Sequence, residues 1–454
     1  MDIIIPCEVA YIIDTLESGG FGAHAVGGCV RDSLLGKTPQ DWDICTSALP
    51  EQTKKCFAGR HIIETGLKHG TVTLMLGHKP FEVTTYRIDG KYTDSRRPDE
   101  VFFVGELEMD LARRDFTINA MAYNPKTGLA DHHGGERDLA GGIIRCVGDA
   151  GRRFREDALR IMRALRFASV FGFSIEGETA RAMHENKALL HSIAAERIAA
   201  ELNKLVTGEG VGGVLSAHLP VLTEVIPEIA PMVGFEQNNP WHYLDVWQHT
   251  LAAVTNAAPD IVLRLAVLFH DLGKPKKYSE DEDGVGHFYG HSQVGHDMAK
   301  EILQRLKYDS NTISAVTQLI LYHDAEIVPR RGNIKRWLNR LGEERFLQLL
   351  EIKRADNRAQ SAALAQKKLE MLDETKTLFD EIIGQRQCFR QRDLAVNGDD
   401  LIAIGIPEGP QTGTTLSRLT ELVIDEEAEN DRAALLEIAK KMLCESKEEP
   451  YGKI

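Results

Sequence analysis

The sequence has few cysteines and no long hydrophobic segment. Its seven cysteines are an odd number and include no Cys-x-x-Cys pair, which is typical of free thiols in a reducing compartment. No apolar run approaches the roughly 18 residues of a membrane span. The N-terminal stretch lacks a basic region, and Pro6, Glu8 and Asp14 interrupt its apolar residues, which excludes a signal peptide. We therefore predict a cytoplasmic protein with no membrane partner.

An excess of positive charge is absent as well. Lys and Arg number 54 against 68 Asp and Glu, which gives a formal net charge of -14. This balance disfavours indiscriminate binding to nucleic acid or to acidic membranes. It leaves room for a local basic groove, because electrostatic steering depends on where the charges lie.

The length and the pattern of elements predict several domains of the α+β class. A chain of 454 residues exceeds what one hydrophobic core usually supports, so two to four domains are expected. From about residue 150 the pattern is helical to the end, whereas the first third mixes both kinds of element. A helix is expected at 8–18 and strands, rich in β-branched and aromatic residues, at 23–26, 41–45, 71–76 and 81–88.

The stretch GGCVRDSLLGKTPQDWDI, residues 27–44, ends in two aspartates separated by a single residue. Side chains on a strand alternate between faces, so Asp41 and Asp43 would share one face while Trp42 and Ile44 point to the core. Two carboxylates on one face repel each other unless a cation lies between them. Hard oxygen ligands of this kind suit Mg²⁺, which is often bound together with substrate phosphates.

The beginning of the same stretch has features of a phosphate site. Gly27 and Gly28 let the backbone approach a ligand closely, and the helix that follows would direct its first amides there. Arg31 adds a forked cation that suits phosphate oxygens. Each feature alone is more often a simple turn or a solvated strand end. Together with the aspartates they predict a nucleoside triphosphate site.

Three motifs in order carry a family resemblance: the stretch 27–44, TGLKHGTVT at 65–73 and LARRDFTINAMAY at 111–123. From about residue 20 to 230 the chain resembles the class II tRNA nucleotidyltransferases of the polymerase β superfamily, which comprise CCA-adding enzymes and bacterial poly(A) polymerases. The resemblance implies an α+β fold with a polymerase β-like head, followed by an all-α region.

The same resemblance implies two-metal nucleotidyl transfer. Asp41 and Asp43 would hold Mg²⁺, which activates the RNA 3′-hydroxyl and neutralises the leaving pyrophosphate. Glu82, on an alternating strand, is the candidate for a third carboxylate, although an exposed strand glutamate is the simpler account. Arg114 would contact the nucleotide phosphates, and Asp115 would accept a hydrogen bond from the ribose 2′-hydroxyl. A charged helix start is the structural alternative for this last pair.

A helix predicted at 154–168 separates apolar residues from arginines. At about 100° per residue, its two faces hold Ala158, Ile161, Met162, Leu165 and Ala168 on one side and Arg160, Arg163 and Arg166 on the other. Ion pairs with distant acids could explain the arginines. The functional alternative is nucleotide recognition, because a fixed carboxylate beside a guanidinium matches the amino donor and ring-nitrogen acceptor shared by cytosine and adenine. Uracil and guanine would leave unmatched partners.

In the family this helix serves as an amino-acid template for CTP and ATP. By resemblance Asp157 and Arg160 would select the base, and Arg163 and Arg166 would support the nucleotide. The intact loop at 89–105 resembles the loop retained by relatives that add the terminal A. The segment 65–73 resembles the tRNA-type signature.

Later motifs resemble the HD phosphohydrolase superfamily: LFHDLGKP at 268–275 and the histidines and aspartates around it. The resemblance implies a second divalent metal, with these candidate ligands: His249, His270, Asp271, His291, His323 and Asp356. Many nucleotidyltransferases carry this fold, and its hydrolase activity is not guaranteed. Five basic residues around Trp337, in the segment 329–340, suit either an RNA backbone or an ordinary amphipathic helix.

These features predict an enzyme that adds CCA to tRNA 3′ ends from CTP and ATP without a nucleic-acid template. The alternatives are a poly(A) polymerase, a partner enzyme that adds only CC or only A, and a metal-dependent phosphohydrolase with an RNA-binding N-terminal part. The oligomeric state stays open. The expected domains are a head at 1–145, a neck at 146–235, an HD domain at 236–370 and a helical tail at 371–454.

Overall fold

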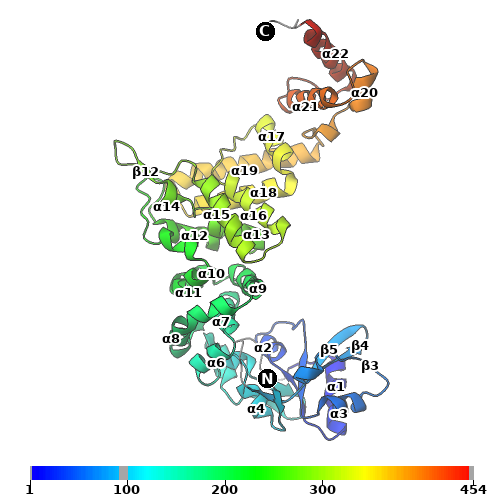
Figure 1. The fold of residues 1–454 in the computed structure, drawn as a ribbon, viewed down its shortest axis with the longest axis vertical. Helices are drawn as coiled ribbons and strands as arrows, with labels where there is room; N and C mark the ends of the chain where they lie inside the picture. The colour runs from blue at the N-terminus through cyan, green and yellow to red at the C-terminus, as the bar shows by residue number, and fades with distance from the viewer. Residues whose placement is uncertain (1–2, 91–100, 449–454) are drawn as a thin grey trace. The chain divides into compact units, whose positions relative to one another are not determined.

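The computed structural model describes residues 3–90 and 101–448 and divides into two compact units (Figure 1). The first unit comprises residues 1–230 and 304–308, and the second comprises 231–303 and 309–454. Residues 91–100, which hold most of the loop predicted at 89–105, lie outside the described residues.

The first unit begins with a seven-stranded mixed sheet in the order β3-β4-β5-β2-β1-β8-β9. Its strands are β1 (Ala23–Val26), β2 (Asp43–Thr46), β3 (His61–Ile63), β4 (Thr71–Leu76), β5 (Lys79–Thr85), β8 (Ala122–Asn124) and β9 (Gly128–Ala130). Only β2 and β5 run parallel, and the other neighbours are antiparallel. The predicted α+β class with a mixed sheet is therefore confirmed.

Helices accompany this sheet. They are α1 (Cys7–Ser18), α2 (Gly28–Leu34), α3 (Pro50–Cys56), α4 (Leu107–Ala112) and α5 (Gly135–Ala140). Figure 1 shows α1 and α3 beside the sheet, where α1 packs on β1 and α3 on β4. Two sides of α1 differ as an amphipathic helix requires, because Val9, Ile12 and Leu16 are wholly buried.

One predicted strand is interrupted. The segment 81–88 leaves the sheet at Tyr86, whose N–H donates to the carbonyl of Thr46 and whose hydroxyl lies 2.9 Å from Nδ1 of His24. Beyond it, β6 (Arg87–Asp89) pairs with β7 (Val101–Phe103) in a separate hairpin. The alternation of apolar and polar residues could not predict this bend, because a tyrosine at position 86 suits a continuous strand as well as a strand that ends there.

The rest of the first unit is nearly all helical. Its helices are α6 (Ala150–Glu156), α7 (Leu159–Phe171), α8 (Gly177–Asn186), α9 (Ala195–Val206), α10 (Val211–Ala217) and α11 (Leu219–Val225). Two short strands, β10 (Ile143–Ile144) and β11 (Ser174–Ile175), tie the sheet region to these helices. The apolar face predicted for α7 is in the core, with Ile161 and Met162 wholly buried.

The described part of the second unit, 231–303 and 309–448, is helical apart from the hairpin of β12 (Ser279–Glu280) and β13 (Gly286–His287). Its helices are α12 (Val246–Asn256), α13 (Ile261–Phe269), α14 (Lys274–Lys277), α15 (His291–Arg305), α16 (Ser310–Tyr322), α17 (Arg331–Leu341), α18 (Glu343–Arg358), α19 (Ala362–Gly384), α20 (Gly398–Ala403), α21 (Pro410–Ile424) and α22 (Arg432–Glu448). Within the described ranges no helix combines the length and the apolar character that crossing a membrane requires.

Candidate functional site

The two aspartates of the first motif lie at the start of β2. The strand begins at Asp43, so Asp41 and Trp42 precede it. The expected alternation is still present, because Trp42 and Ile44 are buried whereas Asp41 and Asp43 are exposed on the other side. The two carboxylates therefore lie on the solvent-accessible face at the centre of the sheet.

Glu82 lies beside this pair. It is directly opposite Asp43 in the parallel pairing of β2 and β5, and its side chain is exposed between the buried Phe81 and Val83. Local desolvation, then the charges of Glu82 and Asp41, raise the pKa of Asp43. Three crowded carboxylates fit a divalent cation, because a cation removes the repulsion that raises this pKa.

The glycine turn before α2 lies against a half-buried arginine. Gly27 has φ +81°, and a Cβ added there would lie 2.9 Å from Nη1 of Arg114. Arg114 also donates to Asp110 at 3.3 Å. The turn, Gly28 at the start of α2 and Arg114 therefore share one small region of the first unit.

Arg31, on α2, is held in place by several partners. Its Nη1 donates to Asn119 at 2.5 Å and its Nε donates to Asp32 at 2.9 Å. The guanidinium lies over the rings of Phe167 and Phe171, with distances of 5.3 and 4.9 Å to their centroids. These contacts fix the orientation of the charge next to the glycine turn.

Sequence reasoning missed Asp110, which is wholly buried. Its Oδ1 accepts from Arg113 at 2.8 Å and its Oδ2 accepts from Arg114 at 3.3 Å. Although burial opposes it, these two arginines lower the pKa of Asp110. Asp110 lies four residues before Arg114, the spacing of helical neighbours, and that spacing was the signal available in the sequence.

Asp115 is also buried and paired. Its Oδ2 accepts from Nη2 and Nε of Arg163, at 2.6 and 2.7 Å, and its Oδ1 accepts from Asn119. Burial opposes ionisation, but Arg163 and Arg160 hold the pKa of Asp115 well below its usual range. Asp115 is consequently an anion at neutral pH, able to accept further hydrogen bonds.

The continuous helix predicted over 154–168 is wrong. The structure has two helices, α6 and α7, because Asp157 adopts an extended conformation with φ -139° and ψ 102°. Its Oδ1 accepts from the N–H of Leu159 at 3.1 Å, a local bond that competes with a continuous helix. Asp157 is thus presented from a break rather than from a helix face.

The arginines of α7 pair with acids, as one of the two sequence interpretations expected. Nη1 of Arg160 donates to Glu156 at 3.0 Å, and Nη1 of Arg166 lies 3.0 Å from Glu201. Asp157 accepts from Arg197 at 3.3 Å. These partners do not exclude nucleotide binding, because each guanidinium has five donors.

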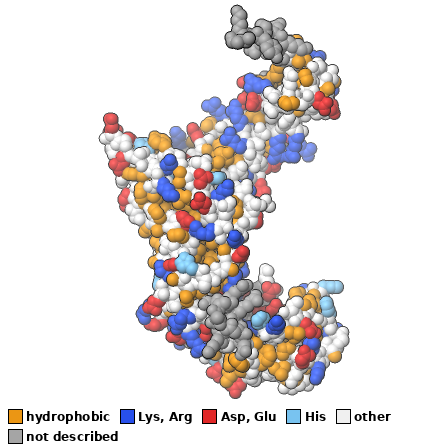
Figure 2. Space-filling view, in the orientation of Figure 1, with side chains coloured by type: hydrophobic (Ala, Val, Ile, Leu, Met, Phe, Trp, Pro, Cys, Tyr) orange, Lys and Arg blue, Asp and Glu red, His pale blue; other side chains and the backbone are white. Residues whose placement is uncertain are grey.

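The basic segment 329–340 does not present a stacking platform. Trp337 is only 8% exposed, and Arg340 lies over its ring. Three other basic residues pair with acids of the second unit: Arg331 with Glu381, Lys335 with Glu426, and Arg336 with Asp425. Figure 2 shows Lys and Arg side chains around α17 and α19 on this face. The segment therefore packs against the C-terminal helices. Trp337 is too buried to stack on an RNA base, so the part of the RNA-binding interpretation that depends on this ring is not supported.

The second unit brings the six candidate HD ligands together. Nε2 of His249 lies 2.8 Å from Asp356 and 3.8 Å from Asp271, and Nε2 of His270 lies 3.2 Å from Asp271. Nε2 of His291 is 3.1 Å from Nε2 of His323, and both are within 3.8 Å of Asp271. These side chains form two groups with metal-ligand spacing that share Asp271. One group adds His249 and His270, and the other adds His291 and His323.

Backbone carbonyls orient three of these imidazole rings toward the cluster. Nδ1 of His270, His291 and His323 lies 2.7, 2.8 and 2.6 Å from backbone carbonyls, so each Nε2 is directed at the cluster. Both carboxylate oxygens of Asp271 and Nε2 of His270 are buried, and Asp271 makes ion-pair contacts with His270 and Lys274 at 3.2 and 2.8 Å. Buried imidazole nitrogens that converge on a carboxylate are a ligand set that fits a divalent metal.

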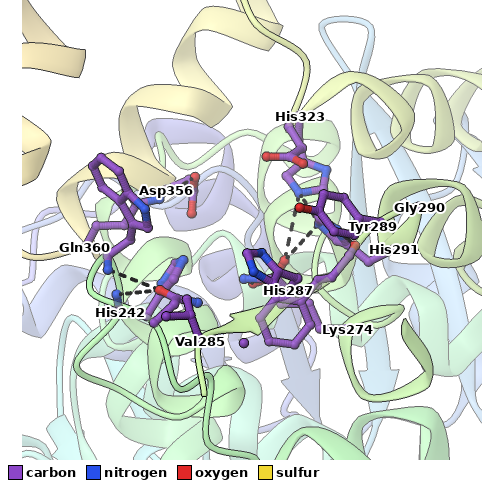
Figure 3. Close-up of a pocket in the computed structure, with 16 residues that line it drawn as sticks. His242, Lys274, Val285, His287, Tyr289, Gly290, His291, His323, Asp356 and Gln360 are labelled. Carbon is purple, nitrogen blue, oxygen red and sulfur yellow. Dashed lines mark hydrogen bonds and ion pairs between the residues drawn. The ribbon is translucent and has the colours of Figure 1, made fainter. Parts of the chain in front are cut away.

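Four of the six candidate ligands line a cavity of about 280 Å³: Asp271, His291, His323 and Asp356. Figure 3 shows Asp356, Gln360 and His242 on one side of it and His291, His323 and Tyr289 on the other. Lys274, missed by sequence reasoning, donates to Gln237 and lies 2.8 Å from Asp271. Although burial opposes it, Asp271 and Asp356 raise the pKa of His270 to about 10, so metal binding would have to displace a proton.

Comparison with known proteins places both units in one class, the nucleotidyltransferases. The profile described as "Poly A polymerase head domain" matches residues 23–145, and "tRNA nucleotidyltransferase domain 2 putative" matches 280–439. A third, "Probable RNA and SrmB- binding site of polymerase A", matches 172–215.

Full-length relatives refine this class. The chain is 32% identical to the CCA-adding enzyme of Lactiplantibacillus plantarum over 451 residues, with 96% of each chain covered. It is 34% identical to that of Pediococcus pentosaceus, covering 95% of this chain and 96% of the relative. A crystal structure of the Bacillus stearothermophilus CCA-adding enzyme in complex with CTP superposes with a TM-score of 0.68, at 30% identity and 98% coverage of both chains. The chain belongs to the CCA-adding enzyme family, which confirms the resemblance.

Proposed function

We propose that this protein adds CCA to the 3′ ends of tRNA, using CTP and ATP, by nucleotidyl transfer without a nucleic-acid template. The observation that carries the proposal is the carboxylate group of Asp41, Asp43 and Glu82 on the sheet of the same unit that holds Asp157 and Arg160. The full-length relatives carry the name CCA-adding enzyme, which favours CCA addition over poly(A) synthesis or addition of CC or A alone.

In this proposal the sheet carboxylates hold Mg²⁺. Members of this family of nucleotidyltransferases need a divalent metal, and the oxygen-only donor set favours Mg²⁺. When bound, the metal lowers the pKa of the attacking 3′-hydroxyl and neutralises charge on the leaving pyrophosphate. Asp41, Asp43 and Glu82 supply the ligands, and Glu82 also keeps their surroundings strongly negative.

The remaining residues orient the nucleotide. Gly28 and the start of α2, with Arg31 and Arg114, would bind the triphosphate through N–H and guanidinium donors. Asp115, held ionised by Arg163, would accept from the ribose 2′-hydroxyl and so favour NTP over dNTP.

Base choice would fall to Asp157 and Arg160. The carboxylate accepts from the exocyclic amino group of cytosine or adenine, and the guanidinium donates to the adjacent ring nitrogen. Arg163 and Arg166 would support the bound nucleotide. We further propose that segments 1–145, 146–235, 236–370 and 371–454 are separate domains, that the tRNA 3′ end is the acceptor, and that the enzyme acts in the cytoplasm, in line with seven unpaired cysteines.

One incorporation assay tests this function. The protein is incubated with Mg²⁺ and tRNA that ends at the discriminator base, at C or at CC, with CTP and ATP separately and together, and the products are sequenced. Products that end in CCA are expected. Long A tails, addition that stops at CC, or no incorporation at all would contradict the proposal.

We propose a second, metal-dependent phosphohydrolase activity for the second unit. Its support is a buried cluster of two ligand groups that share Asp271. His249 and His270 complete one group, and His291 and His323 complete the other. Metal analysis of the purified protein should find a divalent ion that Asp271→Asn loses. The same variant should lose hydrolysis of p-nitrophenyl phosphate and keep CCA addition. An unchanged metal content would contradict this assignment.

A further inference from the structure

Two phenylalanine rings near the end of α7 collect cations from two parts of the first unit. The rings of Phe167 and Phe171 are stacked, with 5.8 Å between their centroids and 6° between their planes. The two residues are four positions apart, so they share one face of α7. The electron-rich face of an aromatic ring attracts a cation, and several cations lie over this pair.

Three of these cations are arginines. Arg163 and Arg166, from α7 itself, lie 5.4 and 3.9 Å from the centroid of Phe167. Arg31, from α2, lies over both rings. Each arginine also has a carboxylate partner; for Arg31, Arg163 and Arg166 in turn, these partners are Asp32, Asp115 and Glu201.

The fourth cation is Lys37, whose Nζ lies 5.1 Å from the centroid of Phe171. Its side chain is exposed, and among the contacts recorded for the described residues it has no carboxylate partner. Arg31 lies 4.9 Å from the same centroid, so one ring holds two cations. A ring attracts a cation without neutralising its charge. Lys37 therefore keeps its charge for an anion that comes from outside the chain.

The end of α2 explains why Lys37 returns to this ring. Gly36 follows the helix with φ +71°, in the left-handed region. Its N–H donates to the carbonyl of Ser33 at 3.0 Å, and the N–H of Lys37 donates to the carbonyl of Asp32 at 2.9 Å. These two bonds are the Schellman arrangement, in which a glycine reverses the chain after the last helical turn. The reversal places Lys37 beside that turn, which carries Arg31.

We propose that Lys37 is a further phosphate-binding residue and that Phe171 positions it together with Arg31. The inference rests on the proposed CCA addition, whose substrates bring phosphate in two forms: the triphosphate of CTP or ATP and the backbone of the acceptor RNA. An ammonium group and a guanidinium held on one ring suit the phosphate oxygens of either form. Phe171 acts through the two cations and does not touch the substrate.

Stepwise fluorination of Phe171 tests the ring directly. Mono-, di- and trifluorinated phenylalanine withdraw electron density from the ring face and nearly preserve its shape. The series should raise the KM for CTP or for tRNA step by step, by about three- to tenfold at the trifluorinated ring, with an unchanged unfolding midpoint. A flat response of both constants would overturn the role of the ring.

The same series at Phe173 is the matched control. The ring of Phe173 lies 5.5 Å from that of Phe171, and no cation is recorded over it in the described part of the chain. Fluorination of Phe173 should therefore leave both KM values unchanged. An equal rise at the two positions would show a packing effect and contradict the proposal.

Substitution of Lys37 identifies the source of the phosphate. The KM for CTP is measured at saturating tRNA, and the KM for tRNA at saturating CTP. Lys37→Met should raise at least one of them by about fivefold or more, and Lys37→Arg should restore most of the loss. The constant that rises shows whether the triphosphate or the RNA is bound. Lys55→Met is the control, because Lys55 is exposed on α3 and lies over no ring among the recorded contacts.

A double-mutant cycle tests the geometry of the helix end. Gly36→Ala strains a left-handed position, so it should displace Lys37 and raise the same KM as Lys37→Met. In a Lys37→Met background, Gly36→Ala should add little. Full additivity of the two effects would contradict the placement of Lys37 by this turn.

The outcomes also distinguish this inference from the proposed function. Wild-type protein that incorporates no nucleotide would contradict CCA addition itself. Wild-type protein that adds CCA, beside Lys37→Met and fluorinated Phe171 variants with unchanged KM values, would leave CCA addition intact and reject the phosphate contact.

Discussion

In the first unit, two groups of buried or crowded aspartates have carboxyl pKa values that move in opposite directions: Asp43 forms one group, and Asp110 and Asp115 form the other. Asp43 shares the sheet face with Glu82 and Asp41, and its pKa is raised. Asp110 and Asp115 are paired with arginines, and their pKa values are lowered. The first group is suited to binding a metal cation, whereas the second group orients arginine side chains of the protein.

Asp43→Asn should abolish nucleotide incorporation. The substitution removes one charge from the proposed metal site without changing the side-chain volume, so kcat should fall by more than about a hundredfold. Single-turnover incorporation of CTP measures this loss. Asp283→Asn, in the exposed turn between β12 and β13, is the control and should keep wild-type rates.

Asp110→Asn should weaken nucleotide binding. Arg114 would lose its carboxylate partner, so the KM for CTP should rise by about tenfold with a smaller change in kcat. Asp138 provides a matched comparison, because it is equally buried but pairs with Arg145 and Thr117 rather than with Arg113 and Arg114. Asp138→Asn should destabilise the protein but leave KM unchanged. Equal KM values for the two variants would contradict the assignment.

The candidate site residues could be predicted from the sequence, whereas some of the residues that form ion pairs with them could not. Asp110 and Glu156 precede their arginine partners by four residues and could have been found from that spacing. Arg197 and Glu201 could not, because 40 and 35 positions separate them from Asp157 and Arg166. Only the packing of α9 on α7 brings them together.

Among the elements, α6 and α7 show the limit of periodicity as a signal. The apolar positions of 154–168 keep a helical spacing across the break, so the pattern predicts one helix. The backbone turns at Asp157 because its carboxylate bonds the N–H of Leu159. In the second unit, by contrast, the order of the HD motifs predicted which residues converge, because each ligand set belongs to a recognised motif.

The contact of α7 with the segment after α9 depends on a glycine. A Cβ at Gly208 would lie 2.3 Å from Oγ of Ser169 and 2.6 Å from its backbone carbon. Gly208→Ala should therefore destabilise the first unit by about 1–3 kcal/mol and lower nucleotide selectivity. Gly213→Ala, where an added Cβ meets no atom within 4 Å, should be neutral or stabilising. Urea unfolding followed by intrinsic fluorescence measures the stability of the two variants, and the ratio of CTP to UTP incorporation measures their selectivity.

At the scale of the whole molecule, acid should weaken the fold through its paired carboxylates. The pKa of Asp110 and that of Asp115 are lower in the folded chain than in the unfolded chain. Each group thus contributes stability that is fully present above its unfolded pKa, near about 4, and that is lost as the pH falls towards the folded value.

Urea unfolding at pH 7 and at successive steps below pH 5 tests this dependence. The wild-type free energy of unfolding should fall with pH, and Asp110→Asn should show a shallower decline, because one of the titrating groups is gone. Identical slopes for the two proteins would show that Asp110 does not contribute to the acid sensitivity.

The register of β2 with β5 has a consequence for folding. Asp43 and Glu82 are paired opposite each other, and the neighbours of Glu82 along its strand, Phe81 and Val83, are buried. A slip of one residue would exchange the two faces of the strand, drive an anion into the core and expose both apolar side chains. The misaligned sheet would thus be heavily penalised. The charges proposed to serve the reaction therefore also disfavour a wrong register of β2 and β5 during folding. Substitutions that remove these charges to disable transfer would also make the wrong register less unfavourable.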